Sequence, residues 1–252
     1  MGVDAYTSSI YQTADFVSGE GQTFVGWQLG AYGELGILRT HPLMLTVQAP
    51  WASSTLYFPQ VDGAARPRST TRRLGDVRLS LQTSVLPDGG PVSVAVEAKV
   101  PMYDNDSVGQ SYGGYERLFP LAGEGQIDLT AWVLGGASLP GNAWLEGAVG
   151  YEHRTNWFVG WQDRDELNFQ DRMRAWCGGG VALGPSFWMV RAEARVALGP
   201  DDGITAESLT LGPSWMIDLA PGIALEPRLA WDAWARNATR GWGVGLGRST
   251  RR

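Results

Sequence analysis

The chain has 252 residues, a formal net charge of −6 at pH 7 and a mean hydropathy of −0.15. The acidic balance argues against nucleic acid as a partner, and the lone Cys177 leaves no intrachain disulfide and no cysteine metal site. No apolar run approaches the ~20 residues that a membrane-spanning helix needs. The length suits a single domain over residues 1–252, for which we expect no metal and no cofactor.

Stretches of alternating apolar and polar residues recur along the chain. In residues 77–85 the odd positions hold aliphatic side chains or Thr, and the even positions are polar. Residues 92–100 repeat the pattern, with Glu97 and Lys99 on the polar side. Because successive side chains of a β-strand leave opposite faces, the alternation predicts strands with one apolar and one polar face. An apolar outside and a charged inside are typical of a transmembrane β-barrel.

We predict about 12 strands, which begin near Asp4, Gln22, Leu43, Gly75, Val92, Gly125, Ala143, Arg172, Phe187, Ser208, Ile223 and Gly241. Residues 39–42, 87–91, 140–142, 184–186 and 220–222 form short connections rich in turn formers. The connections 59–74, 102–123 and 155–172 are longer and polar, and 199–207 is intermediate. This asymmetry predicts an all-β, antiparallel, up-and-down transmembrane β-barrel of the outer membrane of a Gram-negative bacterium, with its short turns in the periplasm. Because such a protein is exported, we expect the chain to be a mature or recombinant form without its signal peptide.

The apolar positions predict the face that contacts lipid. They are Trp27, Leu29, Leu35, Leu45, Val47, Trp51, Ile127, Leu129, Val133, Leu145, Val149, Tyr151, Trp188, Val190, Val196, Leu209, Leu211, Trp215, Ile217, Leu225, Leu229 and Trp231. Many of the 12 Trp residues lie toward strand ends, where their rings can form a girdle at headgroup level. The alternative fold is a soluble β-sandwich, in which the same face would pack against a second sheet.

The opposite positions collect charges of both signs, which we predict to line the lumen. They are Glu34, Arg78, Glu97, Lys99, Asp128, Glu146, Glu152, Arg154, Arg174, Arg191, Glu193, Arg195, Glu226, Arg228, Asp232 and Arg236. Buried charge must be paired or hydrated. The lumen is therefore either a narrow polar channel or is crossed by Arg–carboxylate bridges. We also expect a positive wall at residues 174 and 191–195, facing an acidic wall built from Glu97, Asp128, Glu146 and Glu152.

Several local phrases, in order along the chain, carry a family resemblance. They are Tyr32-Gly33-Glu34-Leu35-Gly36, Leu74-Gly75-Asp76-Val77-Arg78-Leu79, Ala98-Lys99-Val100-Pro101, Gly125-Gln126-Ile127-Asp128 and Gly150-Tyr151-x-x-Arg154. Together the chain resembles the proteobacterial outer-membrane β-barrels of the phenol meta-pathway or transporter-like type. The resemblance implies a barrel of the 12-stranded type that conducts small molecules, hydrophobic or aromatic ones among them. The chain departs from that pattern at Arg251-Arg252, where such barrels end on an aromatic residue.

One phrase points to chemistry. His153-Arg154-Thr155-Asn156 resembles the His-x-Ser phrase of outer-membrane phospholipase A and the lipid A deacylases. The resemblance implies a hydroxyl nucleophile beside a His base that a third group orients. By parity His153 and Thr155 face lipid near the outer rim, but Thr stands where Ser is expected and its methyl group hinders attack. A polar strand end that enters a loop is the simpler interpretation.

Two further features receive structural interpretations. Gly178-Gly179-Gly180 lies in the middle of a predicted strand, where small residues relieve crowding. Arg66, Arg68, Arg72 and Arg73 make the 59–74 connection basic, as expected of a solvated loop or of one that steers anionic solutes.

The sequence thus predicts an outer-membrane barrel that acts as a passive pore or transporter for small molecules and is not an enzyme. Its expected partners are the lipid bilayer and a small solute, and the sequence indicates no particular protein partner. The alternatives are a lipid hydrolase or deacylase that uses His153, and a closed barrel with a structural or interaction role.

Overall fold

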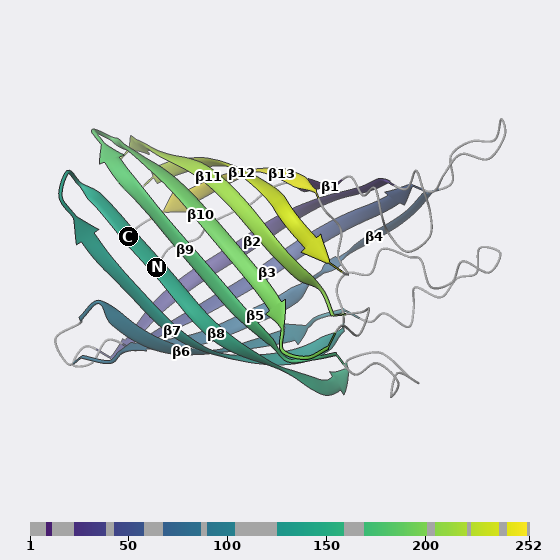
Figure 1. The fold of residues 1–252 in the computed structure, drawn as a ribbon. Helices are drawn as coiled ribbons and strands as arrows, with labels where there is room; N and C mark the ends of the chain where they lie inside the picture. Colours follow the sequence, from purple (N-terminus) through teal and green to yellow (C-terminus); the bar gives the residue numbers. More distant parts are fainter. Residues whose placement is uncertain are drawn as a thin grey trace.

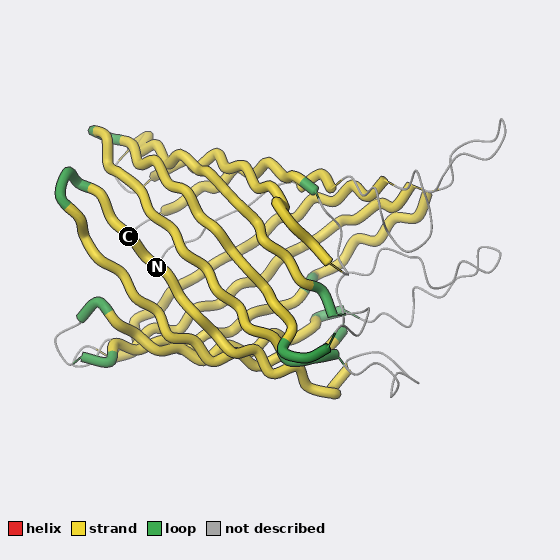
Figure 2. Tube along the Cα trace, viewed as in Figure 1, coloured by secondary structure: helices red, strands yellow, loops and turns green. Residues whose placement is uncertain are grey.

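The computed structural model describes residues 9–11, 23–38, 43–57, 68–86, 90–103, 125–158, 169–200, 205–220, 223–236 and 241–250, and every regular element among them is a β-strand (Figures 1 and 2). The strands are β1 (Ser9–Tyr11), β2 (Thr23–Leu38), β3 (Leu43–Tyr57), β4 (Arg68–Leu74), β5 (Asp76–Ser84), β6 (Val92–Pro101), β7 (Gln126–Leu139), β8 (Ala143–Phe158), β9 (Arg172–Leu183), β10 (Ser186–Ala197), β11 (Glu207–Ala220), β12 (Ile223–Arg236) and β13 (Trp242–Thr250). The described residues hold no helix long and apolar enough to cross a membrane.

All thirteen strands belong to one antiparallel sheet that curls into a barrel (Figure 1). Strands β4 and β5 pair with successive parts of β3, so they are two parts of one strand that is interrupted at Gly75. Gly75 donates its backbone N–H to the carbonyl of Pro50 at 2.7 Å, and a Cβ atom there would lie 3.1 Å from the Pro50 ring. Counted as one, β4 and β5 leave twelve strands round the wall, and the prediction of about 12 in an up-and-down antiparallel barrel is confirmed.

Strand β1 lies between the first and the last long strands. Its three residues pair with β2 over Ser9 to Tyr11, and Ser9 and Ile10 also pair with β13. The seam of the barrel is therefore joined by a short patch and not along the full length of a strand. The remainder of the predicted first strand, which starts near Asp4, lies outside the described residues.

Predicted and observed strand starts agree to within one residue from β6 to β13. The predicted 59–74 loop is wrong in part, because residues 68–74 form β4 and pair with the loop end of β3. This segment is Arg-Ser-Thr-Thr-Arg-Arg-Leu and has no apolar alternation, so the pattern that marked the other strands is missing. Arg72 and Arg73 accordingly lie in a strand, while Arg66 lies outside the described residues.

Tight turns set one end of the barrel. In the β7–β8 turn, which the pairing of Leu139 with Ala143 closes, Gly141 and Asn142 have positive φ angles of 76° and 60°, a conformation that Gly and Asn adopt more readily than other residues. In the β9–β10 turn, Gly184 has a φ of 61°. Both turns lie at the same end, on the left in Figure 2, opposite the end from which the longer connections leave.

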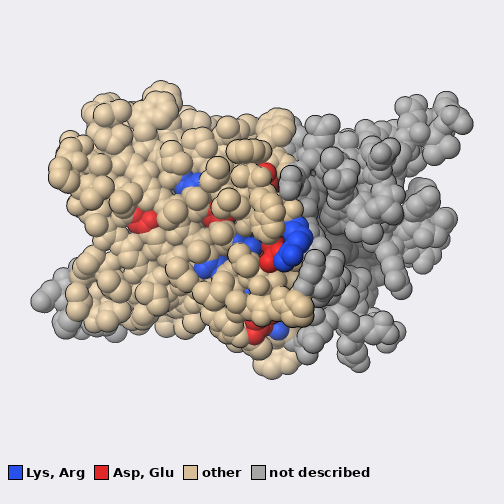
Figure 3. Space-filling view, viewed as in Figure 1, with Lys and Arg blue, Asp and Glu red and all other residues tan. Residues whose placement is uncertain are grey.

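The outer face is apolar, as the parity predicted. Val96 is 60% exposed and Val190 is 59% exposed, whereas the inward neighbours Ala95 and Thr130 are buried. Trp188 and Trp215 stack on the outer face near the turn end, with ring centroids 5.0 Å apart. On the face that Figure 3 shows, most of the described surface is uncharged. The side chains of Trp27, Leu29 and Leu35 lie outside what the structure describes.

Glycines make room for inward tryptophans. Trp132 pairs with Gly150 across β7 and β8, and a Cβ atom at Gly150 would lie 2.5 Å from the indole. Trp144 pairs with Gly180 across β8 and β9, where a Cβ atom would lie 2.6 Å from the indole. The Gly178–Gly180 run thus relieves crowding, and it does so for a ring that projects into the barrel.

Candidate functional site

The inward face of the barrel carries the candidate site. A cavity of about 730 Å³ is lined by residues from β3 and from β5 to β13. Its charged lining residues are Arg78, Glu97, Glu146, Arg174, Arg191, Glu193, Arg195, Glu226 and Arg228. Asp232 lines a second, smaller hollow on the same side of the wall. The side chain of Glu34 lies outside what the structure describes.

A first group of charges is buried where β6, β7 and β8 approach the loop end. Lys99 forms an ion pair with Asp128, and Nε of Arg154 lies 3.6 Å from the same carboxylate. Arg154 also donates to Oε1 of Gln126 at 2.8 Å and stacks on Phe169, with the guanidinium carbon 4.3 Å from the ring centroid. The mutual attraction of these buried charges offsets part of the cost of removing them from water.

Arg174 is the centre of a second group. One guanidinium nitrogen lies 3.0 Å from Oε1 of Glu97 on β6 and 3.0 Å from Oε2 of Glu152 on β8. The other lies 3.9 Å from Oε1 of Glu193 on β10, and the group as a whole lies 4.9 Å from the centroid of Trp132. Because β7 and β8 separate β6 from β9, this side chain reaches across the interior of the barrel.

The contacts of Arg174 correct one expectation. A positive wall and an acidic wall do not face each other, because acids and bases alternate along the contacts around Arg174. Arg78 lies 2.6 Å from Glu97, and Arg195 lies 3.0 Å from Glu193. A long guanidinium side chain can reach a carboxylate more than one strand away. The net charge of the inward residues on each strand therefore does not predict the electric field across the lumen.

The remaining predicted residues are placed as follows. Arg228 lies 3.3 Å from Glu226, Arg236 pairs with Glu207, and Asp232 accepts a hydrogen bond from Thr210 at 2.7 Å. Glu146 and Arg191 both face the cavity, and Arg191 stacks 4.2 Å from the ring centroid of Trp176.

Sequence reasoning missed several residues of the inner face. Arg172 donates from Nε to Oε1 of Glu152 at 2.7 Å, and Glu207 and Gln126 are both almost fully buried. Each lies at a strand end, where the alternation gives way to a loop. Trp144 and Trp176 also line the cavity, and the same parity that placed Glu146 and Arg174 inward would have found them.

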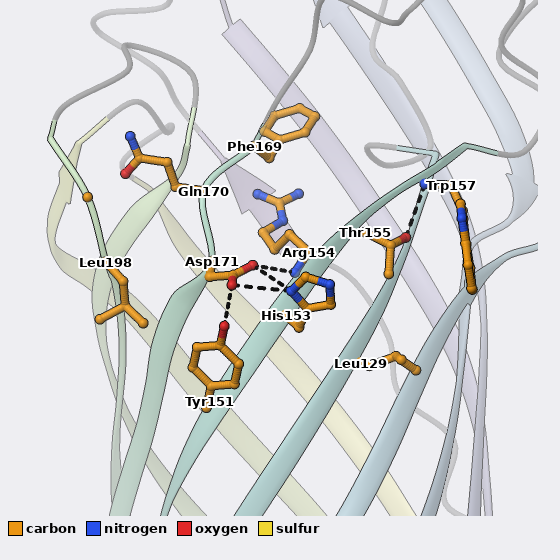
Figure 4. Close-up of a pocket in the computed structure, with 11 residues that line it drawn as sticks. Leu129, Tyr151, His153, Arg154, Thr155, Trp157, Phe169, Gln170, Asp171 and Leu198 are labelled. Carbon is orange, nitrogen blue, oxygen red and sulfur yellow. Dashed lines mark hydrogen bonds and ion pairs between the residues drawn. The ribbon is translucent and has the colours of Figure 1, made fainter.

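The His153 phrase lies at the outer rim, beside a hollow of about 930 Å³ (Figure 4). The imidazole Nδ1 lies 3.1 Å from Oδ1 of Asp171, and the same oxygen accepts a hydrogen bond from the backbone N–H of Arg154 at 2.8 Å. Oδ2 of Asp171 accepts a hydrogen bond from the Tyr151 hydroxyl. Burial raises the pKa of Asp171, but these hydrogen bonds outweigh burial and leave the pKa below its ordinary value. Asp171 therefore orients His153.

The hydroxyl that a hydrolase needs is held elsewhere. Thr155 is buried and does not face lipid, contrary to the parity argument. Its hydroxyl donates to the carbonyl of Ile127 at 2.5 Å and accepts from the N–H of Trp157 at 3.1 Å. Thr155 thus stabilises the end of the strand, and the described residues place Asp171 beside the imidazole instead. No group of three or more His, Cys, Asp or Glu side chains in this described part of the chain is arranged to hold a metal ion.

Comparison with known proteins supports the fold. No protein-family model matches the chain, and no curated protein sequence does. The crystal structure of the COG4313 outer membrane channel from Pseudomonas putida F1 is similar, with a TM-score of 0.64 and 14% identity over 99% of this chain and 93% of that chain. Pseudomonas aeruginosa OccK7 covers 99% of this chain and 97% of its own at 11% identity, but its TM-score is only 0.35. The first likeness is one of fold, and the architecture is that of a transmembrane β-barrel.

Proposed function

We propose that the chain is a passive pore of the bacterial outer membrane that admits small molecules. The observation that carries the proposal is the cavity of about 730 Å³ inside a wall whose outer face is apolar. A lipid-facing exterior and a polar interior that is not filled by side chains are what a diffusion channel needs. The likeness to an outer membrane channel supports the same conclusion.

The sixteen inward charges predicted from the sequence are proposed to line the path, with the Arg174 network as its narrow part. Since Arg174 connects β9 to β6, it restricts the lumen on the side of the long loops. The resemblance to barrels of the phenol meta-pathway type and the inward Trp132, Trp144 and Trp176 favour solutes with an aromatic or apolar body. The solute and the bilayer are the partners that this function requires.

Planar-bilayer recording tests the pore. The protein, folded in detergent with a β-rich circular dichroism spectrum, should insert and give discrete conductance steps. Replacing Arg174 with Ser should increase the step size, because it removes the bridge between β9 and β6, whereas Arg236→Ser at the loop end should change it little. Absence of current from folded, inserted protein would favour a closed barrel with a structural or interaction role.

A further inference from the structure

Two charged side chains of the cavity differ from the rest. Each of the other charged lining residues has an ion-pair partner, as Arg78 has Glu97 and Arg228 has Glu226. Among the described residues, Glu146 and Arg191 have neither a hydrogen bond nor an ion pair through their charged ends, and both face the cavity. An acid and a base have thus been left unpaired in a wall where their neighbours are neutralised.

The backbone places these two residues on either side of one glycine. Gly178 pairs with Glu146 on β8 and with Arg191 on β10, so all three lie at one level of the barrel. Two strand spacings separate the two charged residues by about 10 Å at the backbone. A Cβ atom at Gly178 would lie 3.8 Å from Oε1 of Glu146, so the carboxylate leans over the glycine, toward β10. The missing side chain leaves a notch between the two charges.

Aromatic rings bound the notch along the barrel. Trp176 precedes Gly178 by two residues on the same face of β9, and its ring holds the guanidinium of Arg191 at 4.2 Å. On the turn side, the indole of Trp144 covers Gly180. The guanidinium of Arg191 therefore lies over the face of Trp176, and Arg191 is exposed where it lines the cavity.

We infer that this notch binds a small amphoteric solute that carries both an ammonium and a carboxylate group. The ammonium group pairs with Glu146, the carboxylate pairs with Arg191, and the apolar body of the solute packs against Trp144 and Trp176. The inference rests on the proposed pore, because the notch lies inside its cavity. A simple anion that binds Arg191 is repelled by Glu146, and a simple cation that binds Glu146 is repelled by Arg191. A solute that carries both charges can pair with both residues, so it should bind best.

Isothermal titration of the detergent-folded protein with three probes tests the site. Phenylalanine carries both charges, 3-phenylpropionate lacks the amine and phenethylamine lacks the carboxylate. Phenylalanine should bind most tightly. Glu146→Gln should weaken phenylalanine and phenethylamine roughly tenfold, a loss of one charge-assisted contact, and leave phenylpropionate unaffected or bound more tightly. Arg191→Gln should weaken phenylalanine and phenylpropionate to a similar degree and spare phenethylamine.

A matched control removes the same charges from a neutralised pair in the same cavity. Glu226→Gln and Arg228→Gln should change the phenylalanine affinity less than twofold, because the notch is untouched. Equal affinities for the three probes, or losses as large at residues 226 and 228 as at 146 and 191, would overturn the site. Bilayer current separates the two proposals: conductance without phenylalanine binding rejects the site and retains the pore, and binding without conductance rejects the pore and retains the site.

Discussion

The indole of Trp132 lies against Gly150 so closely that a Cβ atom at Gly150 would come within 2.5 Å of the ring. The two residues pair across β7 and β8, and both face inward. The ring in turn lies 4.9 Å from the guanidinium of Arg174. A glycine on one strand thus positions an aromatic ring on the next, and that ring supports the base at the centre of the ion-pair network.

Gly150→Ala should therefore destabilise the barrel. Its methyl group would overlap the Trp132 ring, and overpacking of this kind costs about 1–3 kcal/mol. Gly135→Ala is the matched control, since the nearest atom to a Cβ there is the Pro91 carbonyl oxygen at 3.6 Å, an ordinary contact. Urea unfolding from lipid vesicles, followed by tryptophan fluorescence, measures both changes. Equal midpoints would show that the indole moves aside freely.

Arg substitutions on adjacent residues of β5 should differ in cost. Leu81 is 39% exposed on the outer face, so Leu81→Arg places a charge in lipid near the middle of the strand and should cost about 2–4 kcal/mol. Ser80 lines the cavity and pairs with Glu97 across β5 and β6, so Ser80→Arg should cost less. Unfolding free energies in vesicles test this order, and the reverse order would mean that the faces have been exchanged.

Removal of Arg174 should be costly. Arg174→Met leaves Glu152, which is 1% exposed, with one fewer cation and deprives Glu97 and Glu193 of theirs in part. Breaking a buried ion pair from one side costs about 3–5 kcal/mol. Arg228→Met breaks the more exposed pair with Glu226 and should cost less than about 1 kcal/mol. Similar losses for both variants in urea unfolding would contradict the central role of Arg174.

Ion selectivity should depend on Arg191 more than on Arg195. Arg195 is neutralised by Glu193 at 3.0 Å, while Arg191 presents its charge to the cavity. Arg191→Ala should therefore shift the reversal potential in a salt gradient toward cation selectivity, because less positive potential remains in the lumen. The same change at Arg195 frees Glu193 and Arg174 to pair more closely, so we expect a smaller shift. A larger shift of the reversal potential for Arg195→Ala than for Arg191→Ala would contradict this order and place the narrowest part of the lumen at Arg195, nearer the end with the long connections.

The pH dependence of stability should report on Asp171. Its folded pKa lies below the ordinary value of about 3.9. The carboxylate therefore stabilises the folded protein fully above that ordinary value, and the contribution is lost as the pH falls through the lower folded pKa. Asp171→Asn should lower the urea midpoint at neutral pH, and the difference from the wild type should shrink as the pH falls through the folded pKa. A constant difference across this range would show that the carboxylate charge is not what stabilises the rim.

The alternation of side chains predicted the barrel because it records a single physical requirement, an apolar face toward lipid. Where that requirement ends, prediction failed: Arg68–Leu74 forms a strand without any apolar face, and the position of Thr155 at a strand end overrides its parity. The same limit hid Asp171 as the partner of His153, since it lies in the connection and not in a strand.

The pairing of the inward charges could be predicted only in part. Parity placed Arg174 and Glu97 on the same side of the wall, but their contact joins residues 77 positions apart and depends on how far the sheet curls. Glu146 and Arg191 differ from the other charged residues of the cavity because they form no ion pair with any residue that the structure describes. The sequence could not predict this, because it does not show which carboxylate pairs with which basic side chain.

The three-residue seam at β1 bears on the order in which the barrel assembles. In the described part of the chain, every other pairing joins strands that follow one another along the sequence, with β4 and β5 counted as one, so hairpins can form as soon as their residues are available. The pairing of Ile10 with Trp242 instead brings together the two ends of the chain, at the largest cost in loop-closure entropy. This contact should form last and open first, which makes the seam the junction at which the barrel is most easily opened.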